Sequence, residues 1–153
     1  MQARDAPDVA PLLLALCSQG FRVPYKMNPQ QFDAVLALSS ADRSSHFVGK
    51  VADWEQLWGV KNDLGWLVPI TPEDLEYFPV WPHPEYAQKI VDEHFPGHHA
   101  VEIPLEEFLS HWLPTFEADN VKVAVFPNKE WVFWGMEPAD LAQCLRDEAA
   151  QYE

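Results

Sequence analysis

The stretch "VWPHPEYA", Val80 to Ala87, gathers side chains that bind or catalyse in other proteins. Its His83 stands between Pro82 and Pro84, and each proline restricts the residue before it to extended backbone. A histidine in such a place could serve as a general base, but that role needs an orienting partner and a substrate pocket. The sequence shows neither, so we predict no catalytic residue here.

Two roles remain open for this stretch. In the structural role, Trp81 fills the core, the prolines turn the chain and His83 caps the next helix by accepting from a backbone N–H. In the functional role, a stiff segment loses little entropy on binding, and Trp and Tyr are favoured anchors. The predicted binding residues are Trp66, Trp81, His83, Glu85 and Tyr86, with Trp66 joining from a neighbouring strand.

Histidines also gather in "DEHFPGHH", residues 92–99. His94, His98 and His99 beside Asp92 and Glu93 are zinc-ligand types. Their spacing matches no established site, because a proline–glycine turn interrupts it, so we predict no metal site and leave incidental metal binding open. Phosphate-binding glycine loops, nucleophile elbows and H-E-x-x-H patterns are missing from the sequence. We therefore predict no cofactor, and an enzyme is the less favoured class.

Charge narrows the class of partner. The 153 residues include 24 acidic and 10 basic side chains, a formal net charge of -14. Residues 1–26 are slightly basic, so the surplus lies in the remaining chain, and one acidic run comprises Glu102, Glu106, Glu107, Glu117 and Asp119. Such a body repels nucleic acid and anionic membranes and attracts basic proteins. We predict a basic protein partner, and neither nucleic acid nor a membrane.

The cysteine content and the hydropathy of the sequence indicate the cellular compartment. Cys17 and Cys144 form no Cys-x-x-Cys pair, and no apolar run has the length of a membrane helix. The run "APLLLALC" is similar to the apolar part of a secretory signal, but Asp5 and Asp8 precede it where positive residues belong. We expect a cytoplasmic protein.

The elements that position these residues begin at Met27. We predict an extension over residues 1–26, with a short helix from Val9 to Leu16, and a single domain over residues 27–153. Asn28 and Pro29 start a helix that runs to about Leu38. Ser39 or Ser40 caps a second helix, which reaches Trp58 and is stopped by Gly59. These two helices form an N-terminal helical hairpin.

Strands and helices then alternate irregularly. The pattern predicts strands at residues 66–70, 76–81, 100–104 and 121–127, and helices at 85–95 and 104–116. Pro79 places its strand at a sheet edge or end. A terminal helix begins at Pro138, with Leu141, Cys144 and Leu145 facing inward. The predicted class is α+β, a small, mainly antiparallel sheet flanked by helices.

The clearest predicted strand pair is a hairpin. Asn128-Lys129 reads as a two-residue connection between the strand that ends at Pro127 and "EWVFWGM". Trp131 and Phe133 fall on one face, and Val132 and Trp134 on the other. Both faces are apolar, which leaves core burial and an exposed contact, with a partner or in a homodimer, as alternatives.

Several of these stretches resemble the bacterial family named domain of unknown function 2750. They are "MNPQQFDAVLALSSADRSSHFVGKVADWEQLWGV", "GWLV", "PVWPHPEYA", "VEIPLEEFLSHWLP" and "VKVAVFP". The resemblance covers about residues 27–152, whereas residues 1–26, "DEHFPGHHA" and "NKEWVFWGM" depart from it. It implies a small cytoplasmic bacterial protein and supplies no activity and no catalytic residue.

The sequence favours a non-catalytic, acidic binding module, of an accessory or immunity type, that recognises a basic protein. Its surface would combine carboxylates with the corner from Trp81 to Tyr86. The alternative is a small-molecule-binding protein or enzyme with a pocket built by Trp66, Trp81, His83 and Tyr86.

Overall fold

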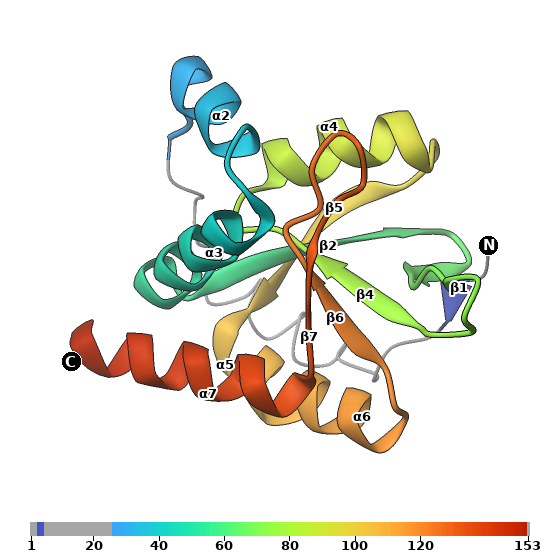
Figure 1. Ribbon diagram of the computed structural model, residues 1–153. Coiled ribbons are helices and arrows are strands. Elements are labelled where there is room, and N and C mark those ends of the chain that lie inside the picture. Colours follow the sequence, from blue (N-terminus) through green and yellow to red (C-terminus); the bar gives the residue numbers. More distant parts are fainter. Residues whose placement is uncertain (1–2, 5–25, 153) are drawn as a thin grey trace.

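The computed structural model describes residues 3–4 and 26–152, which form an α+β fold of two small sheets with helices around them (Figure 1). The predicted fold class is confirmed. The helix predicted from Val9 to Leu16 lies outside the described residues.

The first sheet is antiparallel throughout, with the strand order β1-β3-β2-β5. Its strands are β1 (Ala3–Arg4), β2 (Gln56–Asn62), β3 (Gly65–Leu67) and β5 (His99–Pro104). In the turn between β2 and β3 the side chain of Asn62 accepts from the backbone N–H of Leu64 at 2.9 Å.

The second sheet has the order β4-β6-β7, with β4 parallel to β6 and β7 antiparallel to it. Its strands are β4 (Tyr77–Val80), β6 (Lys122–Val125) and β7 (Trp134–Met136). Pro79 lies in β4 at the sheet edge, as predicted, where a missing N–H is tolerated. Trp58 and Trp81 join the two sheets, since each backbone N–H donates to the other's carbonyl at 2.8 and 2.9 Å.

Helices surround the strands: α2 and α4 lie above them in Figure 1, α5 to α7 lie below, and α3 lies at one end. Their bounds are α2 (Pro29–Leu36), α3 (Ser40–Trp54), α4 (Pro84–His94), α5 (Leu105–Glu107), α6 (Leu113–Ala118) and α7 (Pro138–Ala149). A π-helical turn, Phe108–Trp112, joins α5 to α6, and a 3₁₀ turn, Ala150–Tyr152, follows α7. Asn28 and Ser39 cap α2 and α3 through their side chains, as expected.

The second predicted helix, which was expected to reach Trp58, extends too far at its C-terminal end. It stops at Trp54, Glu55 takes a left-handed conformation with φ 58, and strand β2 follows. Gly59 therefore does not end a helix but lies within β2. A Cβ at Gly59 would stand 3.1 Å from the Trp66 ring and 3.3 Å from the Phe78 ring, so close packing is what favours glycine there.

The predicted two-residue hairpin at Asn128-Lys129 is also wrong. Strand β7 begins only at Trp134, and residues 126–133 form a longer loop between β6 and β7. The side chain of Asn128 accepts from the backbone N–H groups of Glu130 and Val132, at 3.1 and 2.9 Å. Those two bonds use N–H groups that a tight hairpin would have placed in its ladder.

Terminal helix α7 buries Leu141 and Leu145, as predicted, but Cys144 is exposed and Ala142 faces the core instead. The core is rich in aromatic rings, and the largest fully buried ones are Trp81, Trp112, Phe47, Phe78, Tyr86, Phe108 and Phe126. In the π-helical turn the N–H of Leu113 donates to the carbonyl of Phe108, and Trp112 and Leu113 are both buried.

Candidate binding site

The corner before α4 is built as its sequence indicates. Pro84 occupies the first turn of the helix, and the Nδ1 atom of His83 accepts from the backbone N–H of Glu85 at 3.2 Å. The predicted cap role of His83 is therefore confirmed. The ring of His83 is itself buried and lies edge-on to Tyr86, with 6.3 Å between centroids.

The five predicted binding residues do not share one surface. Trp66, Trp81, His83 and Tyr86 are buried, and Glu85 is the one whose side chain is exposed. Trp66 packs against Phe78 and Trp112 in a separate aromatic cluster, while the Nε1 atom of Trp81 donates to the carbonyl of Pro127 at 3.0 Å. These four buried side chains lie beneath the surface. That they contact a ligand stays a prediction.

Tyr86 connects the corner to its neighbours. Its ring stacks on Phe32 of α2, with 4.8 Å between centroids and an interplanar angle of 11°, and it also packs against Phe126 at 4.8 Å. The hydroxyl of Tyr86 has no hydrogen-bond partner in the part of the chain that the structure describes. Burial, assisted by the charge of Glu85, raises the pKa of Tyr86 above its ordinary value, so this phenol stays neutral.

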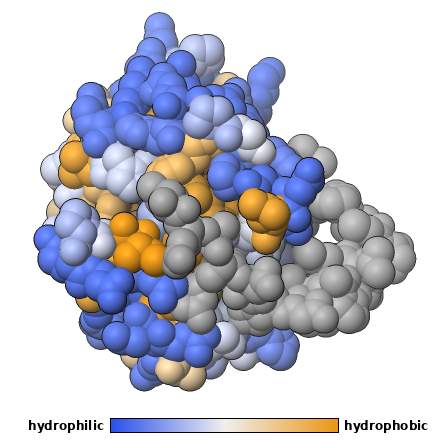
Figure 2. Space-filling view, turned by 90° about the vertical axis from the view of Figure 1, so that its right-hand side faces the viewer, coloured by the Kyte–Doolittle hydropathy of each residue, from blue (hydrophilic) through white to orange (hydrophobic). Residues whose placement is uncertain are grey.

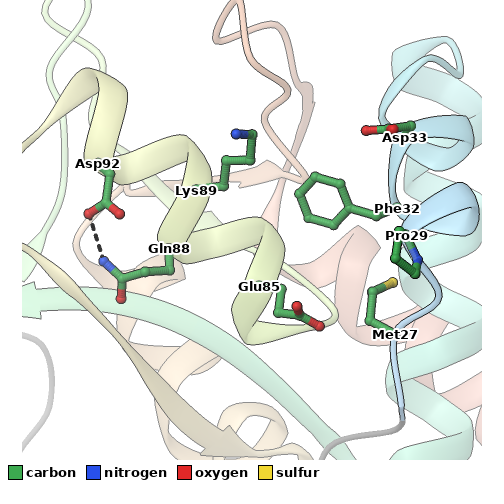
Figure 3. A pocket seen from close by; sticks show the side chains of 8 residues that line it. All are labelled: Met27, Pro29, Phe32, Asp33, Glu85, Gln88, Lys89 and Asp92. Carbon is green, nitrogen blue, oxygen red and sulfur yellow. Dashed lines mark hydrogen bonds between the residues drawn. The ribbon is translucent and has the colours of Figure 1, made fainter.

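A groove of about 610 Å³ lies between α2 and α4 (Figure 3). Its apolar lining comes from Met27, Pro29 and Phe32. Its polar lining comes from Asp33, Glu85, Gln88, Lys89 and Asp92. In Figure 3 the ring of Phe32 projects from α2 towards α4, and Gln88 donates to the carboxylate of Asp92 at 2.8 Å. The α2 side of the groove is thus largely apolar apart from Asp33, and α4 supplies the other two carboxylates and the lysine.

Sequence reasoning found one wall of this groove and missed the other. Glu85 was predicted from the "PHPEY" segment. Trp66 was predicted to join this corner from a neighbouring strand, but the ring that stacks on Tyr86 there is Phe32 of α2. The helical pattern of residues 29–38 does indicate an apolar face that includes Phe32. Which helix this face meets depends on the tertiary fold.

The histidine cluster around α4 is engaged with the backbone. The Nε2 atom of His94 lies 2.6 Å from the carbonyl of Lys129, and the Nδ1 atom of His98 lies 3.0 Å from that of Phe95. Within residues 3–4 and 26–152 no group of three or more His, Cys, Asp or Glu side chains is placed to hold a metal ion.

A buried arginine organises the loop of residues 126–133. Arg43 of α3 is 1% exposed, and its guanidinium donates to the carbonyls of Phe126 at 3.0 Å, Val132 at 2.7 Å and Leu38. Burial lowers the pKa of Arg43, and the charge of Glu130 opposes that shift. Planar, forked donors suit several carbonyls at once, which favours Arg over Lys here.

The same loop holds two aromatic residues in the left-handed region, Phe126 with φ 55 and Trp131 with φ 62. Such a conformation costs a bulky residue about 1–3 kcal/mol. Trp131 packs edge-on against Trp81 and Phe95, which offsets part of that strain. Strain of this kind persists only where the surroundings fix the backbone.

These features define a small α+β protein with an acidic groove and a loop held by a buried arginine. The chain belongs to the family described as "Protein of unknown function (DUF2750)", whose model matches residues 44–145. The match begins within α3, so α2 and its wall of the groove lie outside it. Neither the comparison with curated proteins nor that with solved structures gives a match. None of the helices in the described part is long and apolar enough to cross a membrane.

Proposed function

We propose that this protein is a non-catalytic binding module that holds a basic segment of a partner protein in the groove between α2 and α4. The observation that carries the proposal is that Asp33, Glu85 and Asp92 line a groove whose α2 side is largely apolar. Lysine and arginine have apolar stems and charged heads, so their stems can pack on Met27, Pro29 and Phe32 while the heads meet carboxylates.

The charge of the whole chain supports the same class of partner. With 24 acidic and 10 basic residues, the protein draws cationic surfaces towards it and accelerates their association. Figure 2 shows a face on which hydrophilic residues predominate around a few hydrophobic areas. The alternative pocket of Trp66, Trp81, His83 and Tyr86 is not proposed, because these side chains are packed in the core.

The test uses a fluorescent peptide of alternating lysine and serine as the basic probe. We expect the double variant Glu85→Gln/Asp92→Asn to bind it about tenfold more weakly at low salt, since it loses two charges from the groove. The substitution Lys89→Gln should tighten binding, because it removes a positive charge that repels the lysines of the peptide. Fluorescence anisotropy at 50 mM and 500 mM salt measures both effects, and screening should weaken binding at the higher value.

Helix α7 offers a matched control. Asp140 lies in its first turn as Glu85 does in α4, and Gln143 donates to Asp147 at 2.8 Å as Gln88 does to Asp92. The variant Asp140→Asn/Asp147→Asn makes the same change in net charge away from the groove. We expect it to bind the probe almost as the wild type does. Equal weakening by both double variants would show a general charge effect and would overturn the proposal.

A further inference from the structure

We propose that the recognition surface continues from the groove across the loop of residues 126–133 to an exposed apolar patch of Leu38, Val132 and Trp134. A basic partner segment would place an apolar side chain on this patch. The inference rests on the proposed function, and it adds a second requirement on the partner's sequence.

The patch consists of apolar side chains that the fold leaves in solvent. Leu38 is 37% exposed, Val132 50% and Trp134 44%. The alternation predicted for this segment holds, since Trp131 and Phe133 are partly buried and pack against Trp81 and Tyr77. Val132 and Trp134 therefore face outward because their neighbours face inward.

Arg43 brings the members of the patch together. Two nitrogens of its guanidinium donate to the carbonyls of Leu38 and Val132, so these two main-chain segments are neighbours. Trp134 lies two residues beyond Val132, and both side chains are exposed while Phe133 between them is partly buried. Three exposed apolar side chains thus come from two separate segments.

The loop holds its shape before any partner arrives. Its ties are Arg43 to Phe126 and Val132, Asn128 to Glu130 and Val132, Trp81 to Pro127, and His94 to Lys129. Phe126 and Trp131 remain at positive φ within this set of bonds. Backbone strain that the surroundings maintain is typical of binding segments, and a fixed loop loses little entropy on binding.

The patch and the groove are linked through the core. Phe32 lines the groove and stacks on Tyr86, and Tyr86 packs against Phe126 at the start of the loop. In Figure 1 the loop before β7 rises beside α4, on the side where α2 lies. One extended segment can therefore follow both features.

Charge selects the occupant of the patch. Asp42, in the first turn of α3, is close in sequence to Leu38, and Glu130 is near enough to act on Arg43. An apolar patch on a body with a net charge of -14 fits a segment that combines basic and apolar residues. A second copy of this chain fits poorly, because it carries the same net charge of -14.

The test compares two peptides of equal charge, the lysine–serine probe and a lysine–leucine peptide of the same length. We expect the wild type to bind the lysine–leucine peptide about tenfold more tightly, as burial of one leucine permits. The double variant Val132→Ser/Trp134→Ser should lose this gain and keep its affinity for the lysine–serine probe. Both substitutions are at exposed positions, and circular dichroism checks that the fold is retained.

Leu64 supplies the control, since it is 82% exposed and lies in the turn between β2 and β3. Leu64→Ser should leave the gain from leucine unchanged. A gain that survives in Val132→Ser/Trp134→Ser, or that disappears equally in Leu64→Ser, overturns the inference while leaving the groove intact. Failure of the lysine–serine probe to bind at all would instead overturn the proposed function.

Discussion

Tyr86 and Arg43 are buried residues with polar groups, and they differ in the hydrogen bonds that these groups form. The guanidinium of Arg43 finds three backbone carbonyls, whereas the hydroxyl of Tyr86 finds no partner among the described residues. An unpaired buried hydroxyl is unfavourable, so the ring contacts of Tyr86 with Phe32 and Phe126 must account for its retention.

We expect Tyr86→Phe to leave the stability at pH 7 unchanged or to raise it by up to about 1–2 kcal/mol, because it removes an unsatisfied group. The raised pKa of Tyr86 also sets a pH dependence. In the unfolded chain this phenol ionises near pH 10, while in the folded chain it keeps its proton. The folded state binds more protons there, so wild-type stability should fall as the pH rises above 10.

Urea unfolding at pH 7, 9 and 10.5 measures this effect. The phenylalanine variant should lack the part of the decline that belongs to Tyr86. A loss of stability in Tyr86→Phe at pH 7 would mean that the hydroxyl has a partner after all.

Single residues whose partners are close in sequence were predictable. Asn28 and His83 cap helices that begin beside them, and both roles follow from local rules. Arg43 was not predictable, because the carbonyls of Phe126 and Val132 lie 83 and 89 residues away along the chain. Only the folded structure brings them to the guanidinium.

At the scale of elements, α4 depends on the corner that starts it. His83→Ala removes the acceptor for the N–H of Glu85, so we expect a loss of about 0.5–2 kcal/mol in the free energy of unfolding. His83→Asn keeps a capping side chain and should lose less. Urea unfolding measures the loss of stability in each variant. Equal losses would mean that packing of the His83 ring against Tyr86, and not its capping hydrogen bond, stabilises α4.

Elements whose ends depend on tertiary contacts were predicted least well. The helical spacing of Phe47, Val51, Trp54 and Trp58 suggested one long helix, but the last of these residues belongs to β2. Hydrogen bonds to β5 and to Trp81 outweigh the local pattern there. In the same way, Asn128 was recognised as a turn residue, but the loop that it builds was not.

At the scale of the whole molecule, the charge surplus should oppose folding while it promotes binding. Like charges repel in the compact state, so we expect the melting temperature to rise between 20 mM and 500 mM sodium chloride. Binding of a basic peptide should weaken over the same range. Differential scanning fluorimetry measures the first effect, and the variant Asp140→Asn/Asp147→Asn should reduce it. A melting temperature that falls with salt would indicate that attractive pairs dominate instead.

The class of fold and the family could be recognised from the sequence, because periodic patterns and the unusual "PVWPHPEYA" segment are local signals. The groove could not be assembled in full, because its two walls come from helices that are separated by two strands of one sheet and one of the other. The net charge of the sequence predicted a basic partner, but it did not indicate where on the surface that partner would bind.

The π-helical turn Phe108–Trp112 contains one residue more than an α-helix needs for the same advance. Deleting that residue would rotate the preceding turn by about 100° relative to α6 and carry Leu105 or Phe108 away from the core. Relatives that have an ordinary helix here should therefore be one residue shorter within the helix itself. In this protein the extra residue stands where two adjacent side chains, Trp112 and Leu113, both reach the interior.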